Sequence, residues 1–184
     1  LYLPGRLATR DTLVSMMFQL PELGLLALAM LFPLLSGGFN LAIIATTNMA
    51  ALLMAWIMTT YVDPTGSNAG VVVALALIAG LVAVILVGAI TGYLVATLNT
   101  HPILVTLGTM SIISGVCVWL TRGKPIAGFP EVVQSIGSSM VFGVPLPFWL
   151  FIAATIAVGM VLSRTRFGIS VYMVGSNLEA TRYS

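Results

Sequence analysis

Charged side chains occur at only a few places along this chain, and long apolar segments lie between them. Residues 64–121 contain no Asp, Glu, Lys or Arg. Charge is also absent between Glu22 and Asp63, and again between Glu131 and Arg164. A soluble domain of 184 residues cannot hide uncharged segments of this length, because too small a fraction of such a chain is interior. The pattern therefore predicts that most of the chain lies in lipid.

Five of the apolar segments are long enough to cross a bilayer as helices, which takes about 20 residues. Turn-forming residues separate them, namely Ser36-Gly37-Gly38 after the first segment and the polar run 63–68 after the second. Pro102 stands where it can open the fourth helix. The fold class is therefore an all-α, polytopic transmembrane helical bundle. The predicted spans are residues 12–35, 40–61, 71–98, 102–120 and 148–163.

Two segments are too polar to span. Residues 121–147 carry charged residues and several prolines, and we expect an extramembrane loop there with a short helix at 131–136. Residues 164–184 form a polar tail after the last span. Five crossings put the two ends of the chain on opposite sides. Lys and Arg are almost equally divided between those sides, so charge leaves the orientation open.

The composition excludes several classes of function. Charged residues make up 7% of the chain, against about 25% in ordinary globular proteins, and a formal net charge of +2 provides no basic face for nucleic acid. The single cysteine, Cys117, and the single histidine, His101, lack sequence partners for a disulfide, a metal site or a catalytic set. No phosphate-binding glycine motif occurs. The sequence therefore predicts neither an enzyme nor a bound metal or cofactor.

The third span carries small residues at every fourth position, which places them on one face of the helix. Such a stripe lets another helix approach closely, and close packing is a main source of helix association in lipid. The predicted helix-packing residues are Ala76, Gly80, Gly88, Gly92 and Ala96, interrupted by Val84.

Polar side chains within the spans are the candidates for a solute pathway. Ser and Thr hydroxyls are also easily accommodated in a membrane helix, because they can bond to the carbonyl four residues earlier, so for them both interpretations stay open. The amide of Asn48 has no such local solution and needs a partner or water. The candidate pathway residues are Asn40, Thr46, Thr47, Asn48, Thr106, Thr109 and Ser111.

The second to fifth spans contain no Asp, Glu, Lys or Arg. Proton-coupled carriers and voltage sensors normally place ionisable groups within the bilayer. An ion-coupled carrier is therefore disfavoured. A pathway of amides, hydroxyls and backbone groups suits a neutral polar solute better than an ion.

Three motifs occur in order along the chain, and together they resemble the membrane permease subunit of the bacterial ABC importers for ribose, xylose, galactose and related sugars. The resemblance covers the whole chain and implies a type II ABC importer permease of about ten transmembrane helices, of which this chain corresponds to about five. The motifs are Ser36-Gly37-Gly38-Phe39-Asn40-Leu41, then Pro102-Ile103-Leu104-Val105-Thr106-Leu107-Gly108-Thr109-Met110, then Arg166-Phe167-Gly168 through Tyr172-x-Val174-Gly175-x-Asn177-x-Glu179-Ala180-x-Arg182-x-Ser184.

The resemblance also implies an orientation and a set of partners. It places residues 164–184 in the cytoplasm and residues 121–147 in the periplasm. The implied partners are ABC ATPase subunits, a periplasmic solute-binding protein, a second permease copy or paralogue, and the lipid of the bacterial inner membrane. ATP hydrolysis would occur in separate ABC ATPase subunits. The tail would dock on such a subunit through Gly175, Asn177, Glu179, Ala180 and Arg182.

The chain departs from the family pattern at several positions. The family commonly has Gly-Gly-Ile-Asp-Leu-Ser-Val-Gly across residues 37–44, where this chain has Asn40 in place of the acid. Thr181 and Tyr183 replace the usual Ala and Leu of the docking motif. These changes leave open a nucleoside or another small solute in place of a monosaccharide. A membrane scaffold subunit without transport activity is the alternative that the small-residue stripe alone supports equally well.

Overall fold

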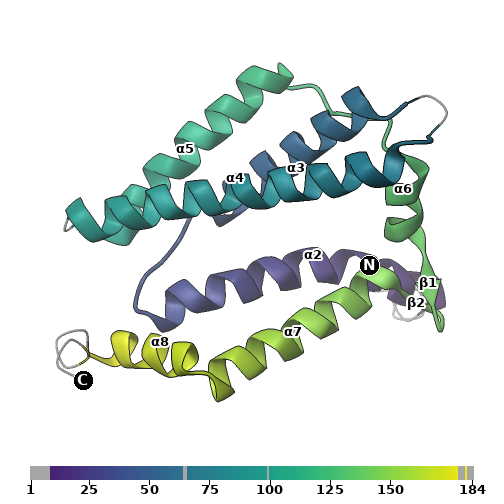
Figure 1. Ribbon diagram of the computed structural model, residues 1–184. Helices are drawn as coiled ribbons and strands as arrows, with labels where there is room; N and C mark the ends of the chain where they lie inside the picture. Colours follow the sequence, from purple (N-terminus) through teal and green to yellow (C-terminus); the bar gives the residue numbers. More distant parts are fainter. Residues whose placement is uncertain (1–8, 64–65, 99, 178–180, 182–184) are drawn as a thin grey trace, which may run out of the picture. The chain divides into compact units, whose positions relative to one another are not determined.

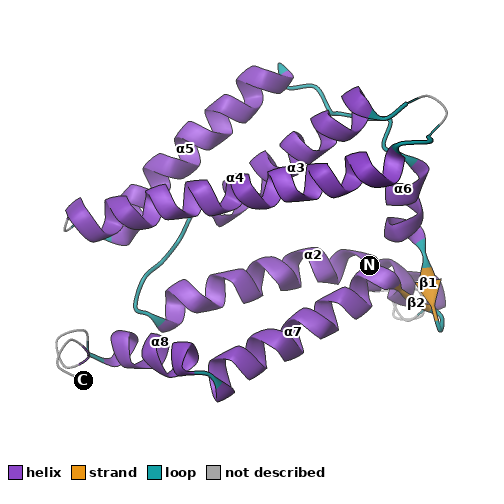
Figure 2. Ribbon diagram, viewed as in Figure 1, coloured by secondary structure: helices purple, strands orange, loops and turns teal. Residues whose placement is uncertain are grey.

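The computed structural model describes residues 9–63, 66–98, 100–177 and 181, and most of these residues are helical (Figures 1 and 2). Five of the helices are long and apolar enough to cross a membrane, which confirms the predicted fold class. In chain order the elements are α2 (Arg10–Leu35), α3 (Ile43–Tyr61), α4 (Ala69–Leu98), α5 (Pro102–Thr121), α6 (Glu131–Ser138), β1 (Met140–Val141), β2 (Val144–Pro145), α7 (Leu146–Arg164) and α8 (Arg166–Ser176).

The helices begin and end where local chemistry favours it. The Thr9 side chain accepts the Thr12 N–H and caps α2, and Pro102 occupies the first turn of α5. At its other end α5 stops at Arg122, which adopts a left-handed conformation with φ 52°. Predicted and observed helices differ by at most three residues at any end. The largest difference is at α3, which begins at Ile43 instead of residue 40.

The chain divides into two compact units. In the unit Gly38–Gln134, α3 packs against both α4 and α5, and these two helices also contact each other. The buried centre of this unit consists of Ala45, Ile113 and Cys117, with Met49, Leu52 and Val87 packed around it.

The other unit combines Leu1–Gly37 with Ser135–Ser184. Within it, α2 runs beside α7, and α8 packs on both of them (Figure 1). The strands β1 and β2 pair as an antiparallel hairpin, and β2 lies against α2 and α7. The short helix α6 agrees with the helix expected near 131–136, whereas neither the hairpin nor α8 was predicted from the sequence.

Large apolar side chains are exposed along all five long helices. On a water-soluble protein such a surface would be unstable. On a membrane protein the same side chains meet lipid or further helices, so the exposure agrees with helices that span a bilayer.

Candidate solute pathway

A pocket of about 450 Å³ lies within the unit Gly38–Gln134, between α3, α5 and the segment that follows α5. None of the described residues that line it is Asp, Glu, Lys, Arg or His. Most of its wall is small or apolar, with an aromatic ring contributed by Phe129. The lining residues are Ala45, Asn48, Ala51, Leu52, Ala55, Ser114, Cys117, Val118, Thr121, Ile126 and Phe129.

Three polar side chains line this pocket, and two of them keep their hydrogen-bonding groups available. The Thr121 hydroxyl donates to the Cys117 carbonyl oxygen at 2.9 Å. The Asn48 amide and the Ser114 hydroxyl, both exposed, make no hydrogen bond within the described residues. Asn48 therefore has the unmet hydrogen-bonding need that its amide predicted, and Ser114 shares it from the facing helix.

The other predicted hydroxyls of the spans are satisfied within their own helices, and none of them lines the pocket. Each donates to the carbonyl oxygen four residues earlier, a bond that Ser and Thr form readily in helices. The bonds run from Thr46 to Ala42 at 2.8 Å, from Thr47 to Ile43 at 2.9 Å, from Thr109 to Val105 at 3.0 Å and from Ser111 to Leu107 at 3.0 Å.

Asn40 and Thr106 organise the backbone that leads into α3. The Asn40 carbonyl oxygen Oδ1 accepts the Ala42 N–H at 2.9 Å, which turns the chain just before the helix and explains its late start. Thr106, only 3% exposed, accepts the Leu41 N–H at 3.2 Å. Its hydroxyl also lies 3.3 Å from the Phe39 carbonyl oxygen. Both side chains are thus engaged with protein backbone, at a place where α5 meets the segment preceding α3.

The small-residue stripe of α4 divides into two halves. Ala76 is fully buried, and a Cβ atom added to Gly80 would lie 2.7 Å from Cγ of Met54 on α3. Gly88, Gly92 and Ala96 are exposed, and a Cβ on either of those glycines would meet nothing within 4 Å. In this second half of α4 the inward face carries Val87 and Thr91 instead. The first half of the stripe therefore lies against α3, while the second half is an open surface.

Of the predicted docking residues, two belong to the described part of the chain. Gly175 lies in the last turn of α8, and Asn177 follows that helix with extended backbone angles. The Asn177 carbonyl oxygen accepts the Thr181 N–H at 3.1 Å. Glu179, Ala180 and Arg182 lie outside the described residues.

The candidate pathway residues predicted from the sequence did not include Ser114, Ile126 or Phe129. Ser114 has the same residue type as Ser111 three positions earlier. Periodicity alone does not reveal which of the two hydroxyls donates a hydrogen bond to a backbone carbonyl of its own helix. Ile126 and Phe129 belong to the segment after α5, which is neither helix nor strand where it borders the pocket. Its position therefore could not be predicted from hydrophobic periodicity.

Comparison with known proteins gives a consistent assignment. The family model described as "Branched-chain amino acid transport system / permease component" matches residues 12–184. The autoinducer 2 import system permease protein LsrC of Escherichia coli (strain SMS-3-5 / SECEC) is 31% identical over 158 residues, which cover 86% of this chain and 44% of LsrC. The L-arabinose transport system permease protein AraH of Escherichia coli K12 is 31% identical over 159 residues, which cover 86% of this chain and 46% of AraH.

The chain thus spans less than half the length of these relatives. No solved structure matches it. The relatives confirm the predicted resemblance to sugar-type importer permeases and, with the five apolar helices, indicate a multi-pass protein of the bacterial inner membrane. The family is one of transport permeases, not of enzymes. With residues 12–184 matched by its model, this chain belongs to the family of branched-chain amino acid transport system permease components.

Proposed function

We propose that this chain is part of the membrane-spanning permease subunit of an ABC importer, and that it carries a monosaccharide or a similar small neutral polar solute across the bacterial inner membrane. The observation that supports this most directly is the 31% identity, over 86% of the chain, to permeases named for autoinducer 2 import and L-arabinose transport. One name gives autoinducer 2 import and the other gives transport of L-arabinose, which is a monosaccharide.

The chemistry of the pocket supports a neutral solute. The described residues of its wall include no charged side chain that would select for an ion. The Asn48 amide can both donate and accept hydrogen bonds, as can the Ser114 hydroxyl. A hydroxylated solute offers both kinds of partner, so we assign solute contact to Asn48 and Ser114.

The proposed transport cycle requires partners outside this chain. A periplasmic binding protein delivers the solute on the side of the loop 121–147. Two ABC ATPase subunits act on the opposite side, where residues 164–184 dock. A second permease copy or a paralogue completes the route. Membership of the permease family supports this arrangement of partners.

Uptake by the reconstituted full-length system tests this proposal. The full-length permease is co-purified with the ATPase and binding protein encoded beside it, and ATP-driven uptake into proteoliposomes is measured for a panel of labelled monosaccharides and nucleosides. We expect saturable uptake of at least one of these solutes, abolished by an ATPase subunit that cannot hydrolyse ATP. An assembled complex that hydrolyses ATP but imports none of them would overturn the proposal and favour a scaffold role.

A further inference from the structure

The hairpin β1/β2 is fixed firmly to the helices beneath it. Pro145, which pairs with Met140 in the strand register, is completely buried. The Leu146 N–H donates to the Ser139 carbonyl oxygen at 2.9 Å and closes the base of the hairpin. Because β2 also packs on α2 and α7, the hairpin cannot swing freely about its base.

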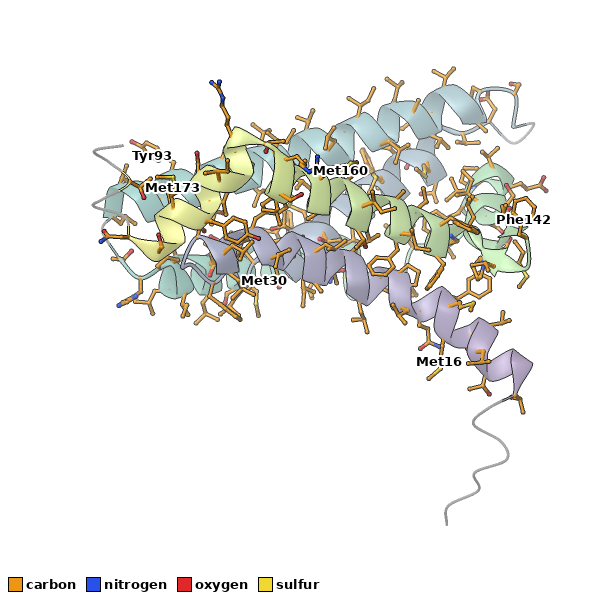
Figure 3. The ribbon with its side chains drawn as sticks, turned by 90° about the horizontal axis from the view of Figure 1, so that it is seen from below. Met16, Met30, Tyr93, Phe142, Met160 and Met173 are labelled. Atoms are coloured by element: carbon orange, nitrogen blue, oxygen red, sulfur yellow. The ribbon has the colours of Figure 1, made fainter. Side chains whose placement is uncertain are left out.

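The tip of this hairpin carries an aromatic side chain in an unusual conformation. Phe142 has φ 54° and Gly143 has φ 78°, as in the two-residue turns that normally favour Asn-Gly. A residue with a Cβ is disfavoured at positive φ, and a bulky one especially so. Phe142 is also 96% exposed, and Figure 3 shows it at the hairpin. Neither turn preference nor packing within the described residues accounts for an aromatic ring at this position.

The length of α7 fixes the height of the hairpin relative to the membrane. At 1.5 Å per residue, the 19 residues of α7 extend about 28 Å, close to the ~30 Å thickness of the hydrocarbon core. The whole of Leu146–Arg164 is therefore needed to cross. The hairpin, which ends where α7 begins, must lie directly at the membrane boundary.

Trp149 connects the hairpin to that boundary. It lies in the first turn of α7, and its indole Nε1–H donates to the Val141 carbonyl oxygen at 3.2 Å. Trp side chains gather at the level of the lipid headgroups, where one part of the ring is apolar and the N–H needs a partner. Here the partner is the hairpin itself, which holds the tip at the same level.

We infer that the hairpin tip is a lipid-interface anchor, in which Phe142 inserts into the headgroup region of the leaflet next to it. Residues 139–146 contain no charged side chain, so moving the tip out of water desolvates no charge. Met140, two residues before Phe142, is also apolar and 53% exposed. This inference depends on α7 crossing the membrane and not on which solute the protein carries.

Site-specific fluorescence tests the anchor in the full-length protein. Phe142→Cys in a Cys117→Ala background is labelled with an environment-sensitive nitrobenzoxadiazole probe and placed in phosphatidylcholine nanodiscs. We expect quenching by headgroup-level nitroxide lipid and protection from aqueous iodide. The matched control is Glu131→Cys at the exposed, charged start of α6, where iodide should quench and the lipid nitroxide should not. Iodide quenching at residue 142 equal to that at residue 131 would overturn the inference.

Two further results would also overturn it. Shielding at residue 142 that appears only after the binding protein is added would assign the tip to a protein partner. The variant Phe142→Gly, which suits positive φ and removes no internal packing, should leave the melting temperature in detergent unchanged or higher. A clear fall in that temperature would show that the ring stabilises the fold itself and does not serve as an anchor.

Discussion

The backbone carbonyl of Leu35 occupies the place where a side chain on Gly175 would start. A Cβ atom built on Gly175 would lie 3.0 Å from the Leu35 carbonyl carbon and 3.4 Å from Cα of Ser36, and closer still to the Leu35 oxygen. The last turn of α8 therefore meets the end of α2 backbone to backbone. The rings of Phe32 and Phe167, with centroids 6.1 Å apart, provide a second contact between the same two helices.

Replacing Gly175 with Ala should consequently force α8 away from α2. Overpacking of this kind usually costs about 1–3 kcal/mol. We expect a lower melting temperature in detergent and weaker ATPase co-purification, because α8 leads directly into the proposed docking segment. The control is Gly159→Ala on α7, where an added Cβ meets nothing within 4 Å. Equal behaviour of the two variants would show that the α2–α8 contact is not a tight one.

Asn48 is expected to contact solute, since its amide lines the pocket and makes no hydrogen bond to any residue in the described part of the chain. Asn48→Leu should lower uptake about five-fold, equivalent to roughly 1 kcal/mol for one hydrogen bond, while membrane insertion stays normal. Thr47→Val is the matched control, because the Thr47 hydroxyl bonds to Ile43 of its own helix and lies outside the pocket. Unchanged uptake by Asn48→Leu, measured beside Thr47→Val, would remove Asn48 from the pathway.

Thr106 should contribute to stability and not to solute binding. Thr106→Val removes the acceptor of the Leu41 N–H and leaves that group without a partner in a part-buried place, at a cost of about 1–3 kcal/mol. Thr106→Ser retains the hydroxyl and should restore most of the loss. Thr109→Val, which removes only a bond to the Val105 carbonyl of the same helix, should have a smaller effect on thermal unfolding in detergent. If the two valine variants unfold at the same temperature, the link between α5 and the segment before α3 contributes little.

The two halves of the α4 stripe should respond differently to a large side chain. Gly80→Leu places bulk against Met54 and should destabilise the α3–α4 pair by about 1–3 kcal/mol. Gly88→Leu extends into open space in this chain and should leave the unfolding temperature of α3 and α4 unchanged. If Gly88→Leu instead disrupts the purified full-length complex, a further helix packs on that half of the stripe.

Accessibility to a membrane-impermeant thiol reagent should separate the two extramembrane ends. In a Cys117→Ala background, Ser138→Cys should label from the periplasmic side and Ser176→Cys only after the cytoplasmic side is opened. Both positions are exposed, at the ends of α6 and α8. Only α7 lies between the two positions as a membrane span. Labelling of both from one side would therefore contradict the crossing by α7, and with it the prediction of five crossings.

The helices were predictable because their determinants are local. Charge-free runs, Pro102 at a helix start and the glycines after residue 35 are all visible in the sequence and set the spans to within a few residues. The helix α8 was not predicted, since its stability depends on a Thr165 cap and on two glycines that allow close backbone contact. Thr165 accepts the Gly168 N–H at 3.2 Å, and such tertiary fits leave little trace in hydrophobic periodicity.

The candidate site was predictable only in part. The argument that an amide must find a partner led to Asn48, and the pocket is where that residue lies. The same argument could not rank the hydroxyls, because each is able to bond to its own helix. For Asn40 a pathway role stays a prediction, and the structure shows its side chain accepting the Ala42 N–H in the turn before α3. Which polar groups remain available depends on three-dimensional neighbours.

The hydroxyls that bond to their own helices have one more property, which concerns direction. Their protons are committed to backbone carbonyls, so each oxygen retains only lone pairs for any other contact. The oxygens of these four hydroxyls can therefore accept further hydrogen bonds but have none to give, unlike the Asn48 amide and the Ser114 hydroxyl. At these four oxygens a molecule that brings its own O–H or N–H group can form a hydrogen bond, whereas an anion, which requires a donor, cannot. A preference for hydrogen-bond donors over acceptors therefore arises without any charged side chain at Thr46, Thr47, Thr109 and Ser111.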